Sequence, residues 1–200
     1  RYPVPSIDFN QVSGSLCTIK KTAFSSNAAT SALAGQANAC TQTPTTLTSA
    51  YLPQRATNGS FSTTKGYLIQ LNNNNTYDLY RVDNETDTAT NSYTGALTRT
   101  LAASAVAVPS SGVIFAEDNV WVRTNGSFSG RLTIAAGRLA SSTNAANITI
   151  VDNVLYSTKN GSDAIGLIAE GTVKIAPYAP PNTGNFTLEV DAAIIAQTGS

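Results

Sequence analysis

The stretch of sequence that decides the fold runs from Gly112 to Ala176 and reads GVIFAEDNVWVRTNGSFSGRLTIAAGRLASSTNAANITIVDNVLYSTKNGSDAIGLIAEGTVKIA. It consists of short runs rich in Val, Ile, Leu and aromatic residues, separated by Gly, Asn, Asp and Ser. Such runs are typical of β-strands, and the residues between them are typical of turns. No helical period interrupts the series. The sequence therefore predicts a succession of short strands.

Large apolar residues recur at a constant interval of 18 residues through this region and beyond it. The series comprises Ile114, Leu132, Ile150, Ile168 and Phe186. A fixed interval of this length is typical of a solenoid, in which each turn buries its apolar side chains against the next turn. We therefore expect a mainly β protein with a parallel β-helix-like solenoid over residues 109–200. A β-sandwich with strands every 8–12 residues is the alternative.

The region upstream, residues 65–108, predicts a β-hairpin and connecting strands. GYLIQL and TYDLYRV flank Asn72–Asn75, and Asn tolerates the left-handed backbone that a hairpin turn requires. A further strand is expected from Leu97 to Val108. Pro109 to Gly112 then marks a boundary.

Residues 1–64 predict a short helix and a disulfide-closed excursion. Apolar residues at helical spacing form one stripe, made of Phe9, Val12, Leu16, Ile19 and Ala23. Cys17 and Cys40 are the two cysteines, and an even count in an exported chain favours one disulfide over a metal site. The bridge would contribute about 3–4 kcal/mol. We expect residues 1–64, 65–108 and 109–200 to form one continuous domain.

Composition narrows the range of functions. The chain has 12 basic and 12 acidic residues, so it has no net charge to attract nucleic acid. It contains no His, which excludes Ser-His-Asp and Cys-His nucleophiles and histidine zinc sites. The polar residues are mostly Thr, Ser and Asn, which favours an extracellular or cell-surface location. We expect no cofactor and no catalytic residues.

The ends of the sequence also shape the prediction. The chain begins at Arg1 and contains no Met, so we expect a signal or anchoring segment to precede it. No stretch approaches the roughly 20 apolar residues of a membrane span. Contact with a membrane is therefore expected only through a segment outside this chain.

Three groups of residues are candidate sites. Asp152 and Glu170 are 18 residues apart and would stack in a solenoid, as glycosidase carboxylates require, although both are also expected turn residues. Trp121, with Arg123 nearby, is expected on the outer face of its strand, where it would contact a sugar ring or partner, or pack on the N-terminal helix. Asp83, Glu85 and Asp87 alternate as at the start of a calcium loop, but Thr88 and Thr94 replace the required Gly and Glu, so no metal site is predicted.

The segments GVIFAE from Gly112, NVWVR from Asn119, GRLTIA from Gly130 and ITIVDNVLY from Ile148 resemble a known family, as does AIGLIAEGTVKI from Ala164. It is a family of bacterial surface domains that follow prepilin-like helices in proteins associated with type IV pilus systems. VPSIDF from Val4 and the hairpin resemble the head region of those proteins. The resemblance implies a pilus accessory subunit or adhesin and transfers no catalytic residue.

Together these observations predict an extracellular structural or adhesive domain, in its most specific form a pilus or filament component. The expected partners are protein subunits, through self-assembly or pilus components, or surface glycans. A carbohydrate-active β-helix enzyme and a passive glycan-binding module are the alternatives.

Overall fold

The structure is a computed structural model that describes residues 12–55, 62–86, 97–141, 144–180 and 187–197. It is mainly β, as predicted. Two helices come first, α1 (Val12–Ser25) and α2 (Ser31–Ala34). The strands are β1 (Tyr51–Leu52), β2 (Gly66–Leu71), β3 (Thr76–Glu85), β4 (Leu97–Ala107), β5 (Val113–Ala116), β6 (Asn119–Thr124), β7 (Arg131–Ala136), β8 (Ile148–Ile150), β9 (Ala164–Ala169), β10 (Val173–Ile175) and β11 (Ala193–Ala196).

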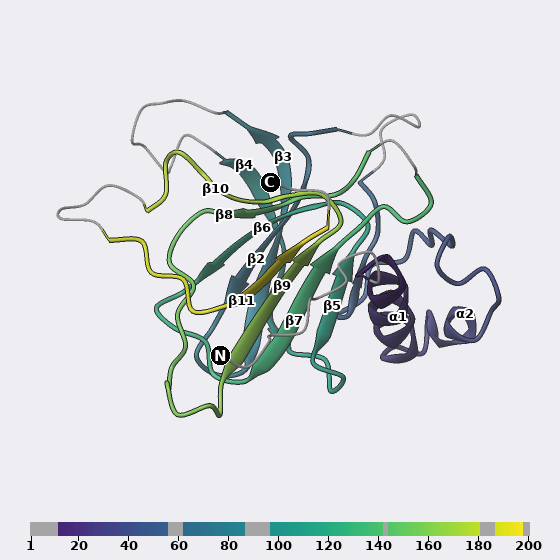
Figure 1. The fold of residues 1–200 in the computed structure, drawn as a ribbon, viewed down its shortest axis with the longest axis horizontal. Coiled ribbons are helices and arrows are strands. Elements are labelled where there is room, and N and C mark those ends of the chain that lie inside the picture. The colour runs from purple at the N-terminus through teal and green to yellow at the C-terminus, as the bar shows by residue number, and fades with distance from the viewer. Residues whose placement is uncertain (1–11, 56–61, 87–96, 142–143, 181–186, 198–200) are drawn as a thin grey trace, which may run out of the picture.

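The strands form two sheets (Figure 1). The first sheet has the order β1-β5-β7-β9-β11, and all its pairs are parallel. The second sheet has the order β10-β8-β6-β2-β3-β4. Its strands are parallel from β10 to β2, whereas β3 and β4 are antiparallel to their neighbours. From β5 to β10, successive strands alternate between the two sheets.

The main core lies between the two sheets. Alternate residues of each strand point inward, so Ile114 and Ile134 of the first sheet pack in one cluster with Ile69 and Val122 of the second. All four side chains are fully buried. Short polar corners, such as Glu117 and Asp118 between β5 and β6, carry the chain from one sheet to the other.

The expected 18-residue ladder is wrong. Ile114 pairs with Ile134, 20 residues on, and Leu132 pairs with Ile165, 33 residues on. Ile150 belongs to the other sheet, in β8, and Phe186 lies outside the described residues. The loops between strands differ in length, so the register is set by the pairing of strands and not by a constant count along the chain.

The predicted hairpin and the strand after it are confirmed. β2 and β3 pair from Leu71 and Tyr77 back to Gly66 and Val82, with the asparagine turn between them. Asn75 has a φ of 57°, the left-handed conformation that the turn requires. β4 ends at Ala107, just before the predicted boundary. The hairpin strands belong to the same sheet as β6, β8 and β10.

The predicted helix and disulfide are also confirmed. α1 packs on the outer face of the first sheet, where Leu16 and Phe24 join a cluster with Tyr51 and Phe115. Cys17 and Cys40 form a disulfide with their Cα atoms 5.1 Å apart. The bridge ties α1 to the segment that follows α2. Phe9 of the expected stripe lies outside the described residues.

Candidate functional site

Both sheets end at one end of the molecule in strands with exposed apolar side chains. β10 is the last strand of the second sheet and β11 the last strand of the first, and the two contact each other. Ile175 of β10 is 56% exposed and Ile194 of β11 is 47% exposed. Within the described part of the chain, neither strand has a neighbour on its outer side.

These two isoleucines occupy positions that face the core. Ile175 pairs with Ile150, and Ile194 pairs with Leu167. Ile150 and Leu167 are buried in the core, and parallel register partners point to the same face of a sheet. The isoleucines are exposed because, among the residues that the structure describes, no further strand covers them.

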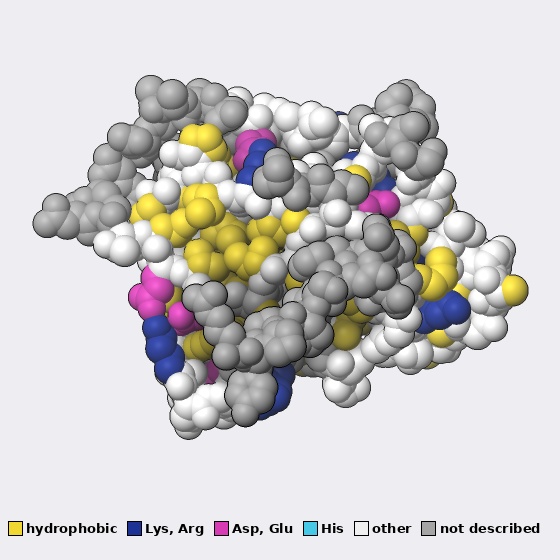
Figure 2. All heavy atoms as spheres, in the orientation of Figure 1, with side chains coloured by type: hydrophobic (Ala, Val, Ile, Leu, Met, Phe, Trp, Pro, Cys, Tyr) yellow, Lys and Arg dark blue, Asp and Glu magenta, His cyan; other side chains and the backbone are white. Residues whose placement is uncertain are grey.

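Neighbouring apolar side chains extend this surface, which we call the C-terminal edge. It comprises Val173, Ile175, Leu188, Val190, Ala192 and Ile194. Figure 2 shows hydrophobic side chains gathered on this face between β10 and β11. Lys159, with Glu189 and Asp191, forms an exposed charged group beside it. The surface therefore has an apolar centre with charges at its border.

The opposite end of the two sheets is protected. β1 has only two residues, both buried, and α1 lies against it. β4 has mostly exposed side chains and three register shifts against β3, and Ala105 within it has a φ of 48°. Short strands, bulges and polar side chains are the devices that prevent an edge strand from pairing with another chain.

A second candidate site is a buried ion pair between α1 and the corner that follows β5. Lys20 Nζ contacts Glu117 Oε1, and the side chains are 0% and 1% exposed. The same Nζ donates a hydrogen bond to Cys40 O at 2.9 Å. Phe24 and Phe115 place their ring centroids 5.6 and 5.7 Å from it. The pair is thus enclosed by aromatic rings.

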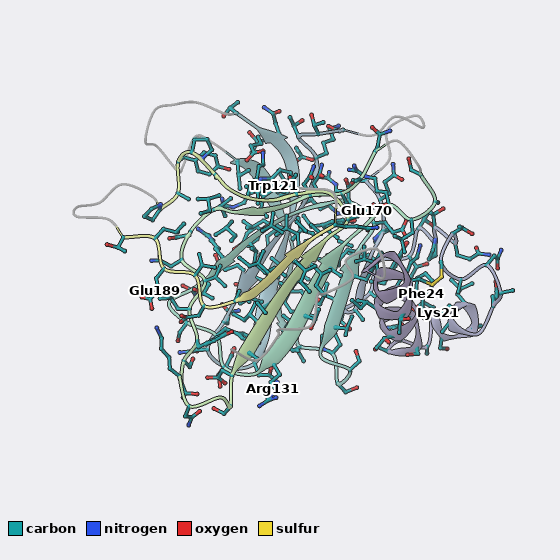
Figure 3. The ribbon with its side chains drawn as sticks, viewed as in Figure 1. Lys21, Phe24, Trp121, Arg131, Glu170 and Glu189 are labelled. Atoms are coloured by element: carbon teal, nitrogen blue, oxygen red, sulfur yellow. A yellow bond between two sulfur atoms is a disulfide. The ribbon has the colours of Figure 1, made fainter. Side chains whose placement is uncertain are left out.

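Burial opposes the charge on both partners. It raises the pKa of Glu117 to about 7, although the positive charge and hydrogen bond of Lys20 act in the opposite direction. It lowers the pKa of Lys20, although Glu117 acts to raise it. Glu170 lies just beyond the end of β9 (Figure 3), and its negative charge acts to raise the pKa of both groups. The neutral forms of the two groups are therefore favoured relative to water.

A second buried ion pair supports the same corner. Asp118 and Arg138 are paired with side chains 3% and 5% exposed. Asp118 also accepts hydrogen bonds from the backbone N of Arg55, at 2.9 Å, and from that of Asn119. The carboxylate of Asp118 is therefore occupied by one guanidinium group and two backbone N–H groups.

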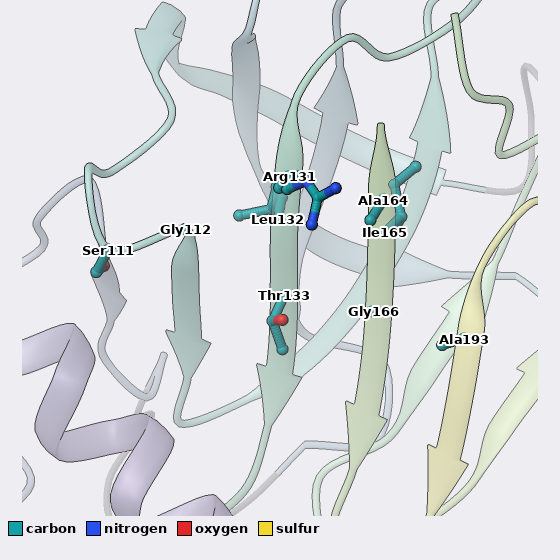
Figure 4. A pocket seen from close by; sticks show the side chains of 9 residues that line it. All are labelled: Ser111, Gly112, Arg131, Leu132, Thr133, Ala164, Ile165, Gly166 and Ala193. Carbon is teal, nitrogen blue, oxygen red and sulfur yellow. The ribbon is translucent and has the colours of Figure 1, made fainter. Parts of the chain in front are cut away.

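A shallow depression on the outer face of the first sheet carries no comparable chemistry. Small residues at one register position, Thr133, Gly166 and Ala193, form its floor (Figure 4). Arg131 lies at its border and donates hydrogen bonds to the carbonyls of Gly161 and Ser162. The depression exists because these side chains are short.

The prediction for Trp121 is wrong in both of its forms. The side chain is 1% exposed, so it has no face for a sugar or a partner, and it packs against Leu68, Val82 and Tyr178 and not against α1. Its Nε1 donates a hydrogen bond to Glu85 Oε1 at 2.9 Å, and Tyr178 donates to the same oxygen. Residues of β3, of β4 and of the segment after β10 cover the indole ring. Arg123, two residues on, is half-buried.

Asp152 and Glu170 do not come together. Glu170 follows β9 in the first sheet and Asp152 follows β8 in the second. Asp152 accepts a hydrogen bond from the backbone of Asn153, and Glu170 accepts one from Arg138. Both therefore act at chain corners. In the described residues, no three acidic or cysteine side chains are grouped as a metal site would need.

Neither Lys20 nor Glu117 was identified from the sequence as a candidate site residue. A signal existed, because Lys20 lies four residues after Leu16 and four before Phe24, on the apolar stripe of the helix. A lysine at such a position must be paired or must lose its charge. Its partner was not evident, since Glu117 is 97 residues away.

Comparison with known proteins gives no match: no family model fits the chain, and neither a curated protein nor a solved structure is significantly similar to it. The resemblance to pilus-associated surface domains stays a prediction. Among the described residues, no helix has the length and apolar character needed to cross a membrane.

Proposed function

We propose that this chain is a non-enzymatic structural domain of the cell exterior that associates with a second copy of itself through the C-terminal edge. The observation that carries the proposal is the exposure of Ile175 and Ile194 at positions that face the core. Burying one such side chain is worth about 1.5–3 kcal/mol, so covering the edge is strongly favoured.

The arrangement of residues 109–200 is interpreted here as a short solenoid. The alternation of β5 to β10 between two sheets, with parallel pairing in each, supports it. The unequal intervals between paired residues depart from a regular repeat. In a solenoid, the exposed last turn is where further strands can be added.

The second copy is proposed to bind end to end. A head-to-tail contact would need the edges of β1 and β4, which are protected by α1 and by bulges. A two-fold axis between two C-terminal edges would instead pair β11 with β11 and β10 with β10, which extends both sheets together. Such an interface is closed and yields a dimer. A filament would need an additional contact elsewhere on the molecule.

An extracellular role fits the disulfide. A Cys17–Cys40 bridge is typical of proteins that fold in oxidising compartments. An assembly subunit or adhesin, as the resemblance to pilus-associated domains implies, is the role we favour. The enzyme and glycan-binding alternatives have less support, because Asp152 and Glu170 follow strands of different sheets and Trp121 is buried.

The test is the molar mass of the purified chain in solution, measured by light scattering over a range of concentrations. We expect a dimer. Ile194→Lys should weaken it strongly: in a two-fold interface each substitution counts twice, so a cost of about 1.5 kcal/mol per site raises Kd about 100-fold.

Leu101→Lys is the matched control, because Leu101 is 52% exposed on β4 at the protected end. It should leave the dimer unchanged. If the wild-type chain is monomeric at all concentrations, the proposed association is wrong. If long fibres are seen in the electron microscope, the contact between copies is head-to-tail and not two-fold.

A further inference from the structure

The buried contact between Lys20 and Glu117 has the features of a site for covalent cross-linking, independently of the proposed assembly. An amine and a carboxyl group are held in direct contact, and neither reaches solvent. The carboxyl carbon is one bond from the contacted oxygen. Reacting atoms held about 3–3.5 Å apart in a fixed orientation gain an effective molarity of about 10⁵–10⁸ M, which is what a reaction between two tethered groups requires.

We propose that Lys20 Nζ and Glu117 Cδ join in an amide bond, which ties α1 covalently to the corner between β5 and β6. A proton first passes within the pair from the ammonium to the carboxylate. The Nζ lone pair then attacks Cδ, the C–O bond to the protonated oxygen breaks, and one N–H proton leaves with that oxygen as water. The reaction needs no oxidant and no co-reactant.

Desolvation supplies the driving force. Two charges without solvent cost several kcal/mol each, whereas the amide is neutral. The ammonium has three donors, and among the described residues Cys40 O and Glu117 Oε1 accept from it. The amide has one N–H, which Cys40 O can accept at the observed position. The cross-linked form therefore satisfies the site better than the ion pair.

Neighbouring groups fit this chemistry. Phe24, Phe115 and Tyr51 surround the pair and exclude water that would hydrolyse the bond. The Tyr51 hydroxyl is buried, has no hydrogen-bond partner among the described residues, and feels the charge of Glu117. It is available to donate to the oxygen that becomes negative when Nζ adds to Cδ.

The decisive measurement is the intact mass of the full chain, denatured and reduced. The cross-link lowers it by about 18 Da, one water, relative to the mass of the sequence. Digestion with trypsin should give a branched peptide that joins Lys20 to Glu117, with no cleavage after Lys20. Lys21, the next residue along the helix, is partly exposed and should be cleaved normally, as an internal control.

Variants assign the bond to the pair. Glu117→Ala should have its full sequence mass, while the matched control Lys21→Met should keep the loss of water. Because the wild-type mass is measured on the denatured chain, the test does not depend on the folding of any variant. A wild-type mass equal to that of the sequence overturns the proposal, as does a loss of water that maps to any other residues.

Discussion

At the scale of single residues, Lys20 and Glu117 matter because each is buried and each depends on the other. Lys20 belongs to the apolar stripe of α1, so its charge is enclosed when the helix packs on the first sheet. Removing one member of a buried ion pair leaves an uncompensated charge and typically costs about 3–5 kcal/mol. The position of α1 therefore depends on this contact as well as on the disulfide.

Lys20→Met makes the stability of the protein depend on pH. Burial raises the pKa of Glu117 above its unfolded value of 4.5, and the variant removes the lysine that opposes this shift. A raised pKa in the folded state gives stability that is fully present below pH 4.5 and is lost as pH rises through the folded value, about 7 or above. We expect the variant to be less stable at pH 8 than at pH 5 by about 3 kcal/mol.

Urea unfolding at the two pH values measures this difference. The double variant Lys20→Met, Glu117→Leu is the control, because it has no buried carboxyl group and should lose the dependence. An equal stability of Lys20→Met at pH 5 and pH 8 would mean that Glu117 reaches water when its partner is removed.

The cysteines and Trp121 show why residue-level prediction succeeded in one case and failed in another. Cys17 and Cys40 are the two cysteines of the chain, so composition alone was sufficient to predict that they pair in a disulfide. Alternation along β6 correctly placed Trp121 on the outer face of its strand. It could not show that Leu97 and Tyr178, from distant segments, cover that face. Exposure depends on the whole fold, and one strand does not contain that information.

At the scale of elements, the parallel pair β2–β6 joins the hairpin to the rest of the second sheet. Gly66 pairs with Asn119 at the start of both strands and has a φ of 156°. A Cβ added there would lie 2.0 Å from the backbone oxygen of Asn119, well inside contact distance. The two strands can approach only because residue 66 has no side chain.

Gly66→Ala should therefore destabilise the protein strongly. Separating β2 from β6 would break the pairing within the second sheet and disturb the core that it covers, and we expect a loss of about 3 kcal/mol or more. Gly35→Ala is the control, since nothing lies within 4 Å of its added Cβ and its backbone is right-handed; it should be neutral or slightly stabilising. Thermal unfolding of the two variants checks this. Equal melting temperatures would show that β2 shifts to accommodate the methyl group.

The elements were better predicted than their arrangement. β-branched runs between Gly and Asn turns identified β5 to β10 because strand formation there follows from local composition. Register depends on which strands meet, and the connections are unequal: β7 and β8 are joined by a loop, whereas β5 and β6 are joined by two residues. The 18-residue ladder therefore paired residues that lie in different sheets.

At the scale of the whole molecule, the two ends of the sheets differ. The end formed by β1 and β4 is protected by α1, bulges and polar side chains, while the other presents core positions to solvent. A head-to-tail polymer needs two complementary ends, and the described residues leave one end of the sheets open. The asymmetry is the physical reason for proposing a closed dimer.

The same asymmetry predicts where hydrogen exchange will depend on protein concentration. In a monomer, the outer amides of β10 and β11 face solvent and should exchange quickly; in the dimer they donate across the interface. We expect their exchange to slow about tenfold or more as concentration rises through Kd. The control is β4, the edge strand at the protected end. The exchange rate of its amides should not change with protein concentration. Slowing in β4 as well, or in neither edge, would contradict an end-to-end contact, because only the C-terminal edge is buried by it.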